Sequence, residues 1–163
     1  IQNGTFDLFS SDHCPFNFDS KDGKLIKGKD TPFKHIPNGI PGVETRLPLL
    51  FSEGVLKNKI SINKFVEITS TNPAKIYGVY PKKGTIAIGS DADIVIWDTE
   101  TNKTITNSDL HSNTDYTPYE GMNVNCWPSI VISRGKIIVQ DGQLQGEKGY
   151  GKFLKSETSS YVY

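Results

Sequence analysis

The sequence predicts an α/β plus β chain, in which a strand and helices precede a β-rich part, and three observations predict this order. Residues 4–9 alternate loosely and are rich in aromatic side chains, as short strands are. Residues 44–78 carry apolar side chains at helical spacing. After residue 80, alternating β-branched runs replace that pattern. A single leading strand makes no sheet, so we expect the α/β part to be incomplete on its own.

The first half of the chain divides into a strand, a loop and helices. Residues 19–34 are polar and rich in Gly and Lys, which indicates a loop. Residues 44–54 have one apolar face and predict a helix. Ser61 can cap a second helix, and Pro73 fits the first turn of a third. Gly78 is a natural helix stop.

The second half predicts a small β layer over residues 79–145. The run "GSDAD" (89–93) lies between two strand-like segments and predicts a hairpin, in which Asp91 and Asp93 are solvated turn residues. The run "SRGK" (133–136) predicts a second hairpin. Large apolar rings should fill the core of this layer; they are Trp97 and Trp127.

Composition excludes several classes of protein. The 163 residues include 18 basic and 18 acidic side chains with no long run of either sign, which argues against a nucleic-acid partner. No apolar stretch approaches the roughly 20 residues that span a bilayer, so we expect no membrane partner. The two cysteines are far apart, which argues against a zinc finger or a disulfide framework and favours a reducing, cytoplasmic location. The chain starts without Met inside a strand-like pattern, so we expect a segment of a larger domain.

Several motifs, in order along almost the whole chain, resemble the C-terminal third of the hydantoinase/dihydropyrimidinase family of cyclic amidohydrolases. They are "SSDHCPF" (10–16), "NGIPGVETRLPLLFSEGV" (38–55), "TSTNPAKIYGVYPKKGTIAIGSDADIVIWD" (69–98), "EGM" (120–122) and "VISRGKIIVQDG" (131–142). The resemblance implies the C-terminal part of an amidohydrolase (β/α)8 TIM barrel followed by part of a composite β-sandwich. Residues 1–78 would be the last barrel strand and its helices, 79–145 the sandwich part, and 146–163 a tail that contacts a neighbouring subunit of a homotetramer.

Asp12 is the candidate catalytic and metal-binding residue. It directly follows the strand-like run, and the active site of a (β/α)8 barrel lies where its strands end. The resemblance implies that Asp12 binds one of two Zn²⁺ ions and carries a proton during hydrolysis. A bridging carboxylated lysine and histidine ligands would come from an N-terminal part outside this chain. On the residues alone, an Asp that caps a turn is the alternative.

Asn38 is the candidate substrate-binding residue. The resemblance implies that its main chain binds the ring amide of a small cyclic substrate, whereas Asn-Gly by itself also predicts a tight turn. His13 should have a supporting role, because neighbouring side chains of a strand point in opposite directions. Cys14 reads as a small buried apolar residue. Glu44 and Arg46 could form a structural ion pair or help to shape the loop.

The resemblance implies ring opening of 5,6-dihydropyrimidines to N-carbamoyl-β-amino acids, by the full-length enzyme. Hydantoinase, allantoinase or dihydroorotase activity is one alternative. A non-enzymatic relative of the collapsin response mediator proteins is another, although these lack the acid at the position of Asp12. With one metal ligand, the isolated chain should be inactive and should be structured only beside the remainder of its own polypeptide.

Overall fold

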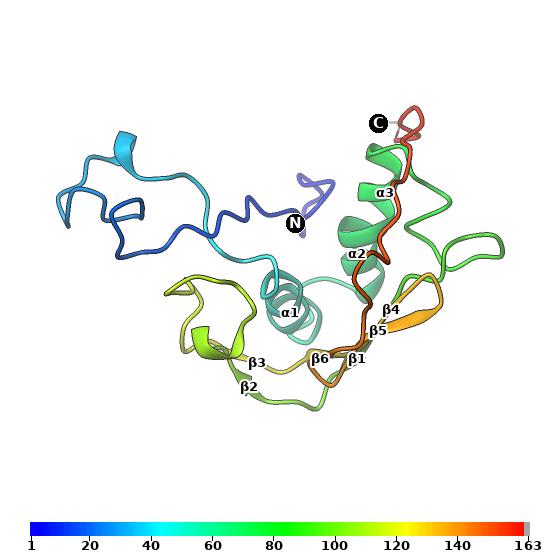
Figure 1. Cartoon of the computed structure of the whole chain (residues 1–163). Helices are drawn as coiled ribbons and strands as arrows, with labels where there is room; N and C mark the ends of the chain where they lie inside the picture. Colours follow the sequence, from blue (N-terminus) through cyan, green and yellow to red (C-terminus); the bar gives the residue numbers. More distant parts are fainter. Residues whose placement is uncertain (162–163) are drawn as a thin grey trace.

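The computed structural model describes residues 1–161 and places a helical layer on a small antiparallel sheet, with an N-terminal loop that projects away from both (Figure 1). The helical elements are η1 (Phe33–His35), α1 (Arg46–Leu50), η2 (Phe51–Val55), α2 (Ile62–Val66), η3 (Glu67–Thr71), α3 (Asn72–Ile76) and η4 (Asn107–Asp109). The strands are β1 (Ile94–Asp98), β2 (Lys103–Thr104), β3 (Asn123–Val124), β4 (Trp127–Ser133), β5 (Lys136–Gln140) and β6 (Gln143–Leu144).

The helices begin and end largely where the sequence predicts. The Ser61 side chain accepts a hydrogen bond from the Lys64 N–H at 3.0 Å, which confirms the predicted cap. Pro73 lies in the first turn of α3 as expected, but α2, η3 and α3 follow one another without a break. The π-helical turn η3 precedes Pro73, which has no N–H for the regular ladder. Gly78, with φ +68°, ends the run.

The main sheet has the strand order β1-β4-β5-β6, all antiparallel, and β2 pairs with β3 separately. The predicted turn at residues 133–136 is confirmed, because Ser133 pairs with Lys136. Arg134 and Gly135 between them have φ values of +46° and +80°. Two consecutive positive φ values match the right-handed twist of the flanking strands.

The predicted hairpin around residues 89–93 is wrong. β1 pairs with β4 instead, in a register that sets Ile96 opposite Ile130. Residues 85–88 form no strand, and the side chains of Ile86 and Ile88 are almost fully exposed. An alternating run becomes a strand only beside another strand, and no described strand lies along residues 85–88.

Ion pairs, and not strand pairing, hold the loop that precedes β1. Lys83 Nζ lies 3.0 Å from a carboxylate oxygen of Asp91 and also bonds to Asp93. Asp93 in turn accepts the backbone N–H of Arg134 at 2.9 Å. The prediction of freely solvated turn carboxylates is therefore wrong, because both are held by one half-buried lysine.

Residues 4–9 form no strand, contrary to the prediction. The Phe9 N–H donates to the carbonyl of Ile68 at 2.8 Å, and the buried Asn72 side chain donates to the carbonyl of Asp7 at 2.7 Å. The segment is thus fastened to η3 and α3 by single hydrogen bonds. A ladder requires a neighbouring strand, and none among residues 1–161 pairs with this run.

Three aromatic rings join the helical layer to the sheet. Phe51 and Phe65 are buried, and each lies within 6 Å of Trp97 on β1, with ring centroids 5.1 and 5.8 Å away. Cys126 packs into the same cluster. Trp97 is partly buried and packs against this core, as predicted. Trp127 is also partly buried, but it lies under the ammonium of Lys103, 4.0 Å from the ring centroid.

The end of the described chain returns to the helices and runs alongside α3 (Figure 1). The Glu157 N–H donates to Gly78 at 2.7 Å, and the Ser160 N–H donates to Lys75 at 3.1 Å. The Tyr161 hydroxyl bonds to Asp7 at 2.6 Å. The tail thus packs on its own chain; a contact with a neighbouring subunit stays a prediction, and its last two residues lie outside the described part. Within residues 1–161, the helices are too short or too polar to cross a membrane.

Candidate active site

Backbone hydrogen bonds bring the segments of the two predicted site residues, Asp12 and Asn38, side by side. The Cys14 N–H donates to the carbonyl of Ile40 at 3.2 Å, and the Ile40 N–H approaches the carbonyl of Asp12 at 3.4 Å. These two contacts form a short parallel bridge between residues that are far apart in sequence. Asp12 and Asn38 are both exposed, on segments that this bridge holds next to each other.

Gly39 makes this close approach sterically feasible. Its φ is +76°, and a Cβ at this position would lie 2.5 Å from the carbonyl oxygen of Asp12 and 2.7 Å from Cβ of Cys14. Any other residue would therefore separate the two segments. The turn geometry and the binding role considered for "NG" are compatible, because the same turn places the Asn38 backbone beside Asp12.

Lys24 holds the Asn38 loop from inside. Its side chain is buried, and Nζ donates to the carbonyl oxygens of Pro37 and Gly39, which flank Asn38. The same ammonium lies 5.9 Å from the centroid of the Phe16 ring. Sequence reasoning missed Lys24, because a lysine in a Gly- and Lys-rich run has the pattern of a solvated loop residue. No local sequence signal distinguishes it from the other lysines of that loop.

His13 has a structural role, as expected. Its Nδ1 accepts the backbone N–H groups of Gly42 at 3.1 Å and Val43 at 3.3 Å. An Nδ1 that accepts two hydrogen bonds cannot also carry a proton, so the neutral ring has its proton on Nε2. His13 therefore fastens the chain that leaves the Asn38 loop, while the adjacent Asp12 side chain stays exposed.

Glu44 and Arg46 do not pair with each other. The Glu44 carboxylate accepts the backbone N–H of His111 at 2.8 Å and lies 3.0 Å from its Nδ1. Arg46 donates to the carbonyl of Phe9, and partial burial lowers the pKa of its guanidinium. Both residues thus tie the segment after the Asn38 loop to distant parts of the chain, which is a structural role. Each bonds a backbone group rather than forming the considered ion pair.

A metal ion would find only one ligand here. Among residues 1–161, no three His, Cys, Asp or Glu side chains gather closely enough to hold a metal. The Asp12 carboxylate is exposed and has no hydrogen-bond partner within the described part of the chain, so it is free to act as a ligand. The donor set fits one corner of a metal centre and does not form a complete one.

Comparison with known proteins assigns the chain to a family. Residues 1–138 match the model of the amidohydrolase family, so the chain belongs to the amidohydrolase family. It is 47% identical to the D-hydantoinase of Ralstonia pickettii over 155 residues, which cover 95% of this chain and 33% of that protein. The chain thus spans about a third of the length of the curated relatives it matches.

Solved structures show the same relationship. The dihydropyrimidinase from Brevibacillus agri superimposes with a TM-score of 0.90 at 47% identity, covering 99% of this chain and 34% of that one. The L-hydantoinase (dihydropyrimidinase) from Arthrobacter aurescens superimposes with a TM-score of 0.82 at 35% identity, covering 93% of this chain and 33% of that one. The arrangement of helices and sheet described above is therefore one that hydantoinases share.

Proposed function

We propose that this chain forms one third of a cyclic amide hydrolase that opens 5,6-dihydropyrimidine rings to N-carbamoyl-β-amino acids. The observation that carries the proposal is the bridge at Ile40, which sets an unpartnered carboxylate, Asp12, beside an exposed backbone turn at Asn38. Relatives named as hydantoinases and dihydropyrimidinase support the reaction class. Because two of these names refer to hydantoin, hydantoin is the second candidate substrate.

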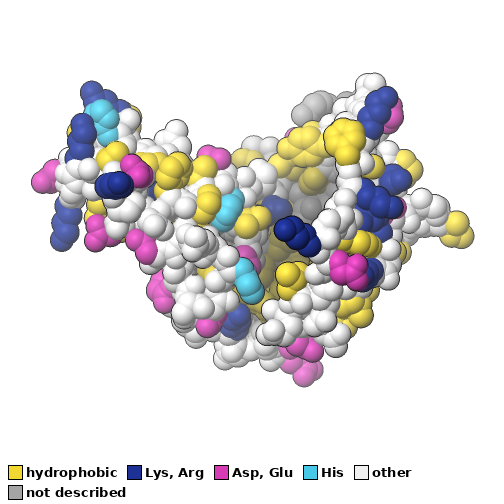
Figure 2. Space-filling view, in the orientation of Figure 1, with side chains coloured by type: hydrophobic (Ala, Val, Ile, Leu, Met, Phe, Trp, Pro, Cys, Tyr) yellow, Lys and Arg dark blue, Asp and Glu magenta, His cyan; other side chains and the backbone are white. Residues whose placement is uncertain are grey.

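The fold of the whole enzyme would be a (β/α)8 barrel with a composite β-sandwich. The exposed apolar side chains of this chain support that proposal, because a domain rarely leaves such groups uncovered. Hydrophobic atoms gather along the rim of the hollow in Figure 2. The large apolar residues that are more than half exposed are Phe6, Phe33, Val43, Ile62, Tyr77, Ile86, Ile88, Leu144 and Phe153. We therefore expect further polypeptide to cover them, and refer to the complete protein as the full-length enzyme.

Asp12 would be both a metal ligand and a proton carrier. Two Zn²⁺ ions are the expected cofactors, with a carboxylated lysine and histidines outside this chain completing the site around Asp12. When bound, zinc supplies an activated water and polarises the ring carbonyl. The Asp12 carboxylate would accept the proton of the attacking water and return it to the ring nitrogen that leaves. Its exposure and its lack of a competing hydrogen bond suit that role.

Asn38 would bind the ring through its main chain. A cyclic amide offers one N–H donor and one C=O acceptor, and a backbone turn offers the complementary pair. The bridge at Ile40 keeps this turn beside Asp12, so a ring bound there would have its scissile bond near the carboxylate. This geometry supports a small cyclic amide substrate.

The test is ring opening by the full-length enzyme with zinc present, measured on 5,6-dihydrouracil, hydantoin, allantoin and dihydroorotate. We expect turnover of dihydrouracil by the wild type and its loss in Asp12→Ala. Asp30→Ala, which removes an exposed carboxylate from the same loop region, should keep wild-type activity. Preference for another ring would move the enzyme to a sister activity, and inactivity on all rings without bound metal would indicate a non-enzymatic binding protein.

Two further properties belong to the same proposal. A homotetramer is expected, and light scattering of the full-length enzyme tests it. The cysteines Cys14 and Cys126 are both free, which supports a location in the reducing cytoplasm.

A further inference from the structure

We propose that Lys24 is a positioning residue for the substrate, because it sets the direction of the Asn38 N–H group. This inference rests on the proposed function and deepens it. Lys24 lies in the projecting loop, fourteen positions before Asn38. It acts through the Pro37–Asn38 peptide, which carries the Asn38 N–H, and through the Gly39–Ile40 peptide, one position further along the chain.

The burial of Lys24 indicates that its ammonium group is part of the packed interior of the loop. Only 9% of the residue is exposed, whereas Lys21, Lys27 and Lys29 of the same loop are exposed. Lysine is rarely buried unless its charge finds partners. Here the partners are the carbonyl oxygens of Pro37 and Gly39, so two of the three ammonium hydrogens are used on one turn.

Because the peptide group is planar, these contacts fix the direction of the Asn38 N–H. In a trans peptide, the C=O of one residue and the N–H of the next point in opposite directions. The Pro37 carbonyl points to Lys24 inside the loop, so the N–H of Asn38 points away from it, towards the exposed side. The Gly39 carbonyl is held in the same way, and its partner N–H on Ile40 approaches the Asp12 carbonyl at 3.4 Å.

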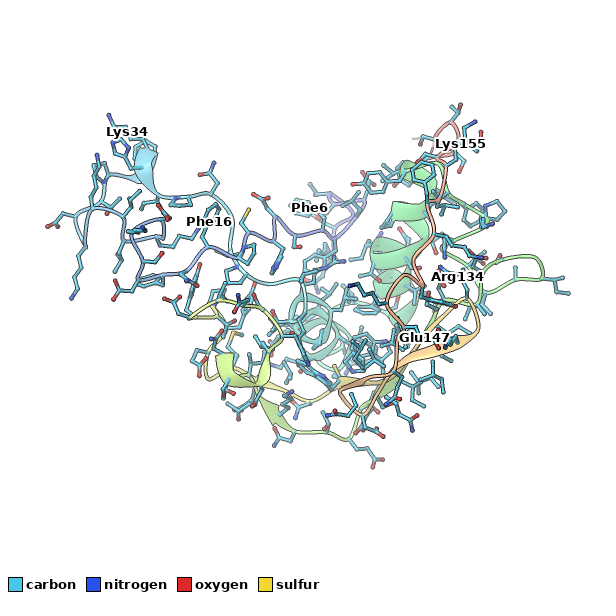
Figure 3. All side chains as sticks on the ribbon, in the orientation of Figure 1. Phe6, Phe16, Lys34, Arg134, Glu147 and Lys155 are labelled. Atoms are coloured by element: carbon cyan, nitrogen blue, oxygen red, sulfur yellow. The ribbon has the colours of Figure 1, made fainter. Side chains whose placement is uncertain are left out.

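Lys24 is itself held in place by the backbone of its loop. Its N–H donates to the carbonyl of Asn17 at 3.0 Å, and the next pair joins Leu25 to Phe18, also at 3.0 Å. The carboxylate of Asp115, from the segment after β2, accepts the N–H of Phe18 at 2.6 Å. Figure 3 shows Phe16 on this projecting loop, with Phe6 nearer the helices. The loop is thus anchored on a distant segment, and the ammonium has a fixed position.

The consequence for catalysis is specific. Without the ammonium, the Pro37–Asn38 peptide can rotate, and the Asn38 N–H no longer has a fixed direction towards the ring. The substrate loses a hydrogen bond that it makes in both ground and transition states. Such a loss raises KM while leaving kcat nearly unchanged. The loss of one hydrogen bond corresponds to an increase in KM of about tenfold.

The experiment compares four forms of the full-length zinc enzyme on 5,6-dihydrouracil: wild type, Lys24→Met, Lys24→Arg and Lys21→Met. Lys24→Met keeps the aliphatic stem and removes the donor, so its KM should rise about tenfold with kcat within a factor of about two. Lys24→Arg keeps a charged donor and should recover part of the loss. Lys21→Met removes an exposed lysine of the same loop and should match the wild type.

Unchanged KM in Lys24→Met would overturn the proposal, and so would a fall in kcat alone. If Lys24→Met does not fold, as shown by thermal unfolding and zinc content, then Lys24→Leu replaces it, because this smaller side chain also removes the donor. An equal KM for Lys24→Leu and wild type would also overturn the proposal. Wild-type inactivity on every cyclic amide would instead refute the proposed function, so the two failures are distinguishable.

Discussion

The ring of Phe51, from the helical layer, stacks on the indole of Trp97, from β1, with 5.1 Å between the centroids and 18° between the planes. Phe65 meets the same indole edge to face, at 85°. Trp97 thus contacts both buried phenylalanines of the helical layer, and Cys126 packs into the same cluster. Offset stacked and edge-to-face pairs of this kind add stabilisation beyond their buried area.

Replacing Trp97 should weaken the packing between the helical layer and the sheet. We expect Trp97→Ala to lower the free energy of unfolding of the full-length enzyme by about 3 kcal/mol, because it leaves a cavity between two buried phenylalanines. Trp127→Ala is the matched control: it removes an equally half-buried indole that lies under Lys103 and not against the buried phenylalanines, and it should cost about 1 kcal/mol. Denaturant unfolding measures both free energies. Equal decreases for the two variants would contradict the role of Trp97 in packing the helices on the sheet.

Gly39 and Gly28 provide a second matched pair. Both have φ values near +77°, but a Cβ on Gly28 would meet nothing within 4 Å, whereas one on Gly39 would lie 2.5 Å from the Asp12 carbonyl. Gly28→Ala should therefore show only the backbone cost of about 1–2 kcal/mol. Gly39→Ala should in addition abolish ring opening, because the Asn38 turn is forced away from Asp12. Steady-state kinetics and thermal unfolding of the two variants distinguish these effects; full activity in Gly39→Ala would refute the bridge geometry.

The Lys83 cluster should make stability depend on pH. Partial burial alone would raise the pKa of Asp93, but hydrogen bonds from Lys83 and the Arg134 N–H hold that pKa below its usual value. A carboxyl with a lowered pKa stabilises the fold above the ordinary Asp pKa of about 4, and this contribution is lost as pH falls through the lowered value. Lys83→Met should therefore weaken the acid dependence of unfolding below about pH 4.

At alkaline pH, the contribution of Lys83 to stability changes in the opposite direction: it is lost as the pH rises. Burial alone would lower the pKa of Lys83, but hydrogen bonds to Asp93 and Asp91 raise it above the usual lysine value. Its contribution is complete below the ordinary lysine pKa of about 10.4 and is lost as pH rises through the raised value. Lys82→Met, at an exposed neighbouring position, should leave the stability unchanged at both acid and alkaline pH. Identical pH profiles for Lys83→Met and wild type would show that the cluster does not contribute.

The two cysteines should react at different rates. Cys126 is fully buried, and burial raises the pKa of its thiol to about 11. Since the thiolate is the nucleophile, Cys126 should resist iodoacetamide near pH 8 until the enzyme unfolds. Cys14 is only half-buried and should be labelled first. Mass spectrometry of peptides from native and denatured protein shows which cysteine is labelled first. Early labelling of Cys126 would show that the helices and the sheet separate readily.

Local signals in the sequence predicted the features that depend on a few adjacent residues. The Ser61 cap, the stop at Gly78 and the turn at Arg134 and Gly135 each follow from the preferences of single side chains. The link between Asp12 and Asn38 came from the family resemblance, and the bridge at Ile40 supports their proximity. Their chemical roles stay predictions.

Features that depend on distant partners were missed. The runs at residues 4–9 and 85–88 have strand composition, but a strand exists only where a neighbouring strand supplies its hydrogen bonds. Lys24 was missed for a related reason. Its identity as a lysine indicates solvent exposure, and only the folded path of the loop brings the carbonyls of Pro37 and Gly39 around it.

Because of the bridge at Ile40, residues 15–37 form a closed loop that can differ in length and sequence. The same two backbone contacts hold both of its ends, so its length can vary while Asp12 and Ile40 stay side by side. Lengthening such a closed loop is thermodynamically mild, since each doubling costs about 0.6 kcal/mol of closure entropy. The entrance to the site can therefore be reshaped by insertion or deletion, provided that the new loop keeps one buried cation to occupy the place of Lys24.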